Sequence, residues 1–188
     1  QNGSQWVLAG TYNFAAGTGG NVKWKADGSL NDGSTATVIS SDAARFVRVG
    51  DVVVQDVVVD NTDSGFSASS NWFTSTYVSG YLGPNYGGRL TEFTGDAATW
   101  SADLTTAGNY EVFARWTSGS SRASSAPYIV YHTGGSTTVN ANQQNNNGTW
   151  VSLGTFNFAT GNSTRVALSC WTSSGTYVIA DGIKLVKQ

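Results

Sequence analysis

The chain has 188 residues, enough to bury a hydrophobic core, and this length suits one ordinary domain with an additional segment or two small domains. Charged residues make up only 12% of the sequence, and the formal net charge is −2. Nucleic-acid binding and a basic membrane-surface patch both need clustered Lys and Arg, so the composition argues against both. No apolar run approaches the roughly 18 residues of a membrane span.

The N-terminal segment repeats the C-terminal part of the chain. Residues 6–17 match residues 150–161 without a gap, and eight of the twelve positions are identical. A second match, with one residue inserted, relates residues 38–48 to residues 178–187. Internal repeats define how a fold is organised. We therefore expect a β half-module over residues 1–50, which repeats the last third of the chain, followed by a complete module over residues 51–188.

Short runs of alternating apolar and polar residues begin near the N-terminus. They include Tyr12 with Phe14 and Val22 with Trp24, and they are bounded by Gly, Asn, Asp and Ser. A period of two predicts β-strands joined by tight turns. Residues 51–60, which are rich in β-branched Val, predict a strand across the seam between the two regions.

A loop-rich passage follows between residues 60 and 86, and regular strands then return. The pattern predicts strands over residues 97–104, 108–116 and 126–132, and residues 137–140 lead into the C-terminal repeat. No segment combines a helical period with helix caps. The sequence therefore predicts an all-β protein, an antiparallel β-sandwich of jelly-roll-like type with an extra N-terminal β half-module.

Seven motifs of the second region occur in a distinctive order. They are Asp60–Phe66, Ser79–Tyr81, Gly108–Trp116, Ser121–Ala123, Ala126–Val130, Trp150–Phe156 and Tyr177–Asp181. In this order they resemble the golvesin C-terminal-like domain, also known as the carbohydrate-binding-like domain at the end of xanthan lyases. The resemblance covers roughly residues 56 to 187. It implies a β-sandwich that serves as an accessory module of secreted bacterial hydrolases, peptidases and surface proteins, with carbohydrate binding as its inferred role.

Two residue types give further information, methionine by its absence and cysteine by its single occurrence. The sequence contains no methionine, which predicts a processed, secreted chain located outside the cell or on its surface. Its single cysteine, Cys170, excludes an internal disulfide. Because Cys170 follows Val166 and Leu168 on one face of an alternating run, we expect a buried thiol rather than an intermolecular bridge.

The chain has few of the side chains that catalysis requires. It contains one histidine, His132, one cysteine and scattered carboxylates. No Ser/His/Asp order, pair of acids or zinc-ligand spacing stands out among them. We therefore expect His132 to have a structural or surface role and the protein not to be an enzyme.

One loop carries candidate metal ligands. Asp60, Asn61 and Asp63 place three oxygen-bearing side chains close together, and hard oxygen ligands of this kind could hold Ca²⁺. The alternative is that these Asp and Asn side chains cap turns by bonding to their own backbone.

Aromatic residues gather in the loop-rich passage and form a candidate sugar site. Stacking on sugar rings is the role expected for Trp72, Tyr77, Tyr81 and Tyr86, while Arg89 would bond to hydroxyl groups. The alternative is that these aromatic residues pack the loops onto the sandwich. Three further tryptophans are expected in the core: Trp100, Trp116 and Trp150.

The N-terminal half-module needs a partner. One front half, about residues 56 to 140, cannot complete two back halves, and the apolar face left over would cost of order 10 kcal/mol in water. The residues expected on this face are Trp6, Tyr12, Phe14, Val22, Trp24 and Phe46. The face could be covered by the module of the same chain, by a neighbouring copy through strand addition, or by an upstream segment.

We therefore expect first an extracellular structural subunit that assembles head-to-tail with copies of itself into a homopolymer, as a fibre, surface or matrix protein. The alternative is a carbohydrate-binding or adhesion module of a larger secreted bacterial protein, with a polysaccharide as its partner.

Overall fold

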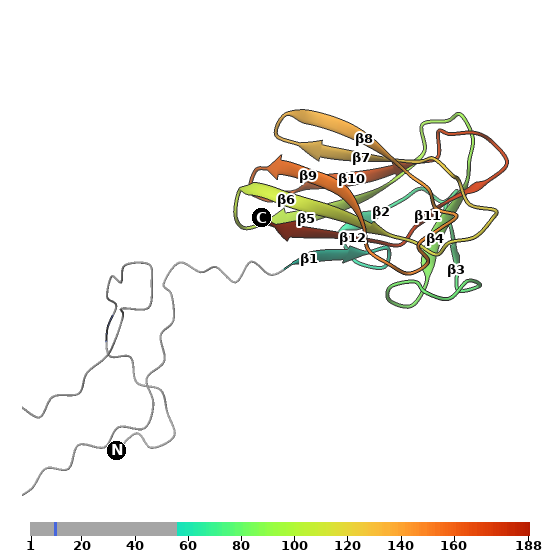
Figure 1. Cartoon of the computed structure of the whole chain (residues 1–188), viewed down its shortest axis with the longest axis horizontal. Helices are drawn as coiled ribbons and strands as arrows, with labels where there is room; N and C mark the ends of the chain where they lie inside the picture. The colour runs from blue at the N-terminus through green and yellow to red at the C-terminus, as the bar shows by residue number, and fades with distance from the viewer. Residues whose placement is uncertain (1–9, 11–55) are drawn as a thin grey trace, which may run out of the picture. The chain divides into compact units, whose positions relative to one another are not determined.

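The computed structural model describes Gly10 and residues 56–188. Residues 56–188 belong to one compact unit, which is built from β-strands (Figure 1). None of its elements is a helix that could cross a membrane. The strands are β1 (Val57–Asp60), β2 (Phe66–Ser67), β3 (Phe73–Ser75), β4 (Tyr86–Leu90), β5 (Ala97–Leu104), β6 (Gly108–Arg115), β7 (Ala126–His132), β8 (Gly135–Ala141), β9 (Val151–Phe158), β10 (Gly161–Ser169), β11 (Tyr177–Ala180) and β12 (Gly182–Lys187).

These strands form three sheets whose named strand pairs are all antiparallel. The strand orders are β1-β12-β6-β9, β2-β5-β10-β7-β8 and β11-β4-β3. Strand β5 buries every second residue, among them Trp100, and β6 does the same with Tyr110 and Val112. The inward faces of these strands pack against buried residues of the other strands and form one hydrophobic core cluster. The predicted antiparallel β-sandwich is confirmed.

Two of the three tryptophans expected in the core lie at its centre. Trp100 and Trp116 are fully buried, and their ring centroids lie 6.5 and 6.2 Å from that of Tyr128. Trp150 is only partly buried, which corrects the expectation for this residue. Its ring lies next to the charged ends of Arg115 and Lys184, at 5.9 and 5.5 Å, so it covers the edge of the sandwich rather than filling the core.

The loop-rich passage contains more regular structure than the sequence suggests. Strands β3 and β4 join β11 in a separate sheet, with Gly88 of β4 between Phe73 and Ile179. The pattern of β4 is hidden because Gly87 and Gly88 have no side chains to alternate. The Phe73 ring packs directly against Gly88, in the space that a side chain would occupy.

Cys170 and His132 have the roles that the sequence predicts. The Cys170 thiol is free and fully buried. The His132 ring stacks on Phe156 with centroids 5.4 Å apart, and its Nε2 lies 3.0 Å from the Thr137 hydroxyl. His132 is therefore a packed surface residue at the end of β7.

The predictions for the N-terminal region fall outside the described residues. Of the strand expected over residues 51–60, the structure describes only the part that forms β1. The residues expected to mediate self-assembly also lie outside the described residues: Trp6, Tyr12, Phe14, Val22, Trp24 and Phe46. The division into regions 1–50 and 51–188 likewise stays a prediction.

Candidate functional site

The segment between β2 and β3 is a tight turn fixed by its own hydrogen bonds. The Trp72 N–H donates to the carbonyl of Ser69 (3.1 Å), and the Asn71 N–H donates to the Ser69 hydroxyl (3.2 Å). A serine side chain that bonds to the backbone two residues later is a common way to close such a turn. The turn carries the Trp72 indole toward the end of the loop that precedes β5.

One carboxylate in that loop holds the turn in place. Asp96 accepts hydrogen bonds from the Ser69 hydroxyl (2.9 Å), the Asn71 amide (3.2 Å) and the Trp72 indole N–H (3.3 Å). A fourth bond comes from Arg89 Nε at 3.0 Å. Burial tends to raise the pKa of Asp96, but these four donors together outweigh burial and hold its pKa below the ordinary value. Asp96 is therefore a carboxylate at neutral pH, and it fixes the position of Trp72.

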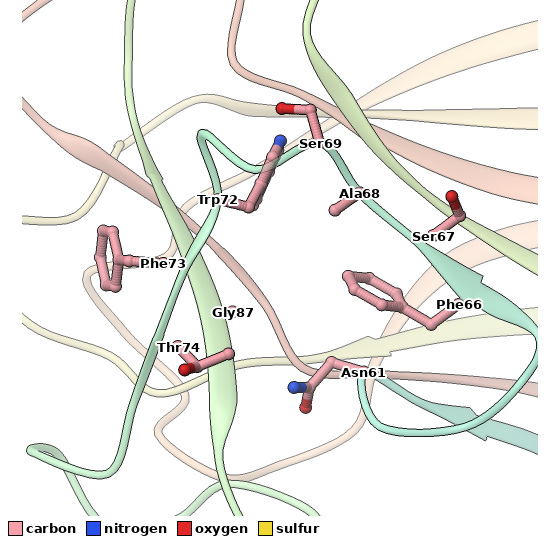
Figure 2. Close-up of a pocket in the computed structure, with 9 residues that line it drawn as sticks. All are labelled: Asn61, Phe66, Ser67, Ala68, Ser69, Trp72, Phe73, Thr74 and Gly87. Carbon is pink, nitrogen blue, oxygen red and sulfur yellow. The ribbon is translucent and has the colours of Figure 1, made fainter.

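A hollow of about 390 Å³ opens beside this turn. Figure 2 shows the Phe66 ring directed toward the open space and the Asn61 side chain at its edge, whereas the Phe73 ring points away from it. The lining consists of Asn61, Phe66, Ser67, Ala68, Ser69, Trp72, Phe73, Thr74 and Gly87. No lining residue is charged. Apolar rings with a few amide and hydroxyl groups, in a hollow of this size, are typical of a small-ligand site.

The residues that form the walls are themselves held by the core. The Phe66 ring packs edge-to-face on Trp100, with centroids 5.3 Å apart. Asn61 is 8% exposed, and its amide is hydrogen-bonded to that of Asn85 at 2.7 Å. Gly87 of β4 completes the lining, and its backbone lies close to the Ala180 carbonyl of the neighbouring strand β11. The hollow is therefore preformed, which reduces the entropy lost when a ligand binds.

The structure does not gather the five residues proposed for sugar binding on one surface. Trp72 lines the hollow, although only 9% of it is exposed. Tyr86 is 2% exposed, and Tyr81 packs against it with ring centroids 6.0 Å apart. Tyr77 is 93% exposed and does not line the hollow. Arg89 does not line it either, because its guanidinium is paired with Asp96 and Glu92.

Two residues of the site, Phe66 and Asp96, are not recognisable from the sequence. Phe66 stands in a strand of two residues, too short to show alternation, and its one local signal is an aromatic residue within a Ser-rich run. Asp96 follows a Thr-Gly pair and reads as an ordinary turn residue. Its four donors lie up to 27 residues away in the sequence, so no local signal marks its role.

The proposed metal ligands act as caps of a turn. The Asp63 carboxylate accepts from the Asp60 N–H (2.8 Å), and the Asp60 carboxylate accepts from the Thr62 hydroxyl (2.5 Å). Asn61 lines the hollow and bonds to Asn85. Within residues 56–188 no cluster of three or more His, Cys, Asp or Glu side chains is placed to hold a metal ion. The arrangement matches the turn-capping alternative.

A second carboxylate, Asp181, lies between β11 and β12 and is fully buried. Both of its oxygens accept from the Leu82 N–H (3.0 and 3.2 Å), and Arg115 Nε lies 3.7 Å away. Burial raises the pKa of Asp181 to about 7, the Asp60 charge adds to the rise, and the Leu82 bond and the Arg115 charge oppose it. Asp181 therefore ties the Leu82 loop to the sandwich and changes charge near neutral pH.

Comparison with known proteins relates this module to xanthan lyases. A xanthan lyase from Bacillus sp. (strain GL1) is 30% identical over 156 residues, which cover 79% of this chain and 16% of that protein. The solved structure of Paenibacillus xanthan lyase has a TM-score of 0.67 and 31% identity, and the match covers 72% of this chain and 13% of that one. This chain thus spans a small part of the lyases that it matches.

The fold is also shared with a carbohydrate-binding module. The native structure of a family 35 carbohydrate-binding module from Clostridium thermocellum has a TM-score of 0.55 and 20% identity, covering 71% of this chain and 99% of that one. At this identity the match shows a common β-sandwich fold. Residues 57–187 match the family model described as the golvesin C-terminal domain. Since this match covers well over half of the sequence, the chain belongs to the golvesin C-terminal domain family.

Proposed function

We propose that this protein is a non-catalytic carbohydrate-binding module and that the hollow between β2 and β3 is its sugar site. The observation that carries the proposal is the hollow itself, where two aromatic side chains, Phe66 and Trp72, stand among amide and hydroxyl groups. Apolar rings match the C–H faces of a sugar, while the Asn61 amide and the serine hydroxyls match its hydroxyl groups. The fold shared with a carbohydrate-binding module supports this function.

The ligand of the hollow is a neutral sugar unit. No Lys, Arg or His side chain lines the hollow. The guanidinium behind it, on Arg89, is already paired with Asp96 and Glu92. The carboxylate of an acidic sugar would therefore meet no free cation and would lie close to the ionised Asp96, which is unfavourable.

This proposal reverses the order of the two functions expected from the sequence. From the sequence we expect first a self-assembling fibre subunit. The family and the solved neighbours instead favour the carbohydrate-binding alternative. Assembly through the N-terminal half-module stays a prediction, because its residues lie outside the described part of the chain. An extracellular or cell-surface location is part of the same proposal.

Affinity gel electrophoresis of the full chain tests the proposal, with xanthan, a neutral β-glucan and polygalacturonate as probes. The variant Thr74→Trp places a large ring at the exposed edge of the hollow without touching the core. We expect the wild-type protein to be retarded by xanthan or β-glucan, and Thr74→Trp to lose this retardation.

The matched control is Thr138→Trp, which makes the same change at an exposed position of β8. This control should bind like the wild-type protein. Two results would contradict the proposal: retardation that is strongest with polygalacturonate, or binding by Thr74→Trp that equals the wild-type binding.

A further inference from the structure

Two large aromatic side chains outside the hollow are left open to solvent. Phe93 is 65% exposed and Trp171 is 58% exposed. Their rings meet edge-to-face with centroids 6.3 Å apart at an interplanar angle of 75°. Apolar surface of this kind is unfavourable in water, so this exposed pair is a candidate binding surface.

The loops that carry the pair are fixed to each other through their backbones. The Glu92 N–H donates to the carbonyl of Cys170 (3.0 Å), and the Cys170 N–H donates to the carbonyl of Asp96 (3.4 Å). The Thr172 hydroxyl adds a bond to the carbonyl of Ser125 (3.1 Å). Because the backbone on both sides is held, the two rings form a rigid platform rather than the tip of a loose loop.

The same loop connects the platform to the hollow. At Asp96 the side chain holds Trp72, while the main-chain carbonyl accepts from Cys170, the neighbour of Trp171. The loop of residues 91–96 therefore carries Phe93 of the platform, and through Asp96 it also holds Trp72 in the wall of the hollow. Phe93 and Asp96, which holds Trp72 at the hollow, are only three residues apart in this loop.

We propose that Phe93 and Trp171 form a second sugar-stacking subsite, which a polysaccharide chain occupies at the same time as the hollow. This inference rests on the proposed function, since it adds a subsite to the same binding surface. The exposed aromatic faces suit the C–H faces of sugar rings. The guanidinium of Arg89, just before this loop, is already paired with Glu92 and Asp96, so it is not free to bind the carboxylate of an acidic sugar, and this subsite also takes neutral units.

Two linked subsites predict a dependence on chain length. A long chain that occupies both sites binds more tightly than a short one, because the second contact is intramolecular. The test compares the double variant Phe93→Ala/Trp171→Ala with the wild-type full chain. The ligands are xanthan, a neutral β-glucan, and β-glucan fragments of two and of about eight sugar units.

The matched control is Tyr131→Ala. Tyr131 is 41% exposed at the end of β7, and the β7–β8 hairpin lies at the opposite end of the sandwich from the loop between β10 and β11 (Figure 1). We expect the double variant to bind the polymers and the long fragment at least roughly tenfold more weakly. The affinity of the double variant for the disaccharide and its midpoint of thermal unfolding should stay at the wild-type values. Tyr131→Ala should change neither the affinity for the polymers nor the affinity for the disaccharide.

The possible failures are distinguishable. If the wild-type protein binds none of the probes, the proposed function fails and the subsite fails with it. If the wild-type protein binds but the double variant holds the polymers equally well, only the subsite is refuted. The subsite is also refuted if the disaccharide affinity falls as much as that of the polymer. A double variant that changes the oligomeric state in gel filtration and not the sugar affinity would assign the pair to a protein contact instead.

Discussion

The buried carboxylate of Asp181 predicts that the protein loses stability as the pH rises toward neutrality. Its pKa is about 7 in the folded protein, against an ordinary value of 3.8. Between these two values the folded state keeps the proton that the unfolded chain has released. The free energy of unfolding must therefore fall as the pH rises through this window.

The size of the effect follows from the two pKa values. Each unit of difference corresponds to about 1.4 kcal/mol, so the complete loss is about 4 kcal/mol. Part of this loss in the free energy of unfolding occurs below about pH 5. The loss between about pH 5 and about pH 8 is therefore about 2–3 kcal/mol. Below about pH 4 the sign reverses, because Asp96, with its lowered pKa, then loses its stabilising charge.

The slope of the free energy of unfolding against pH is measured by urea unfolding, followed by tryptophan fluorescence and repeated across this pH range. The variant Asp181→Asn cannot ionise at this position and should lack this slope, while contributions from the rest of the chain are common to both proteins and cancel in the difference. The reasoning is refuted if the wild type and Asp181→Asn show the same dependence on pH, or if the wild-type protein gains stability relative to the variant as the pH rises.

Two further predictions concern single side chains. Gln143 is fully buried, and its amide is hydrogen-bonded to the Tyr128 hydroxyl and to both backbone groups of Ile179, at 2.8 to 2.9 Å. Because Gln143→Ala leaves these buried groups without partners, it should lower the free energy of unfolding, measured in urea, by about 3 kcal/mol or more. Little change in that measurement would show that these bonds matter little. Asp96→Ala frees the Trp72 turn and should weaken binding to the β-glucan polymer about tenfold in affinity gels, with a loss of about 1–3 kcal/mol in stability. Unchanged retardation would mean that Asp96 does not position the site.

The fold was largely predictable because its signal is local. Strand β5 and strand β7 have the bounds that alternation predicts, and β6 ends one residue earlier. The third sheet could not be predicted from the sequence, because Gly87 and Gly88 leave β4 without an alternating pattern. The partial exposure of Trp150 could not be predicted either, since it depends on Arg115 and Lys184, which arrive from other strands.

The candidate site was predictable only in part. The aromatic enrichment of the loop-rich passage singles out Trp72, which lines the hollow, but it also singles out Tyr86, which faces the core. Arg89, the polar residue expected beside them, is paired with acids. Side chains in irregular loops have no period that tells inward from outward, so composition cannot distinguish a stacking ring from a core ring.

The sequence by itself determined the β-sandwich and the membership of the golvesin C-terminal domain family, because strand periodicity and motif order are written along the chain. Tertiary structure alone decided where the candidate ligand site lies. The hollow exists because Asp96 holds Trp72 across 24 positions of sequence, and the platform exists because two distant loops exchange backbone hydrogen bonds. These contacts join segments that no local pattern relates, and they fix which aromatic faces remain open to solvent.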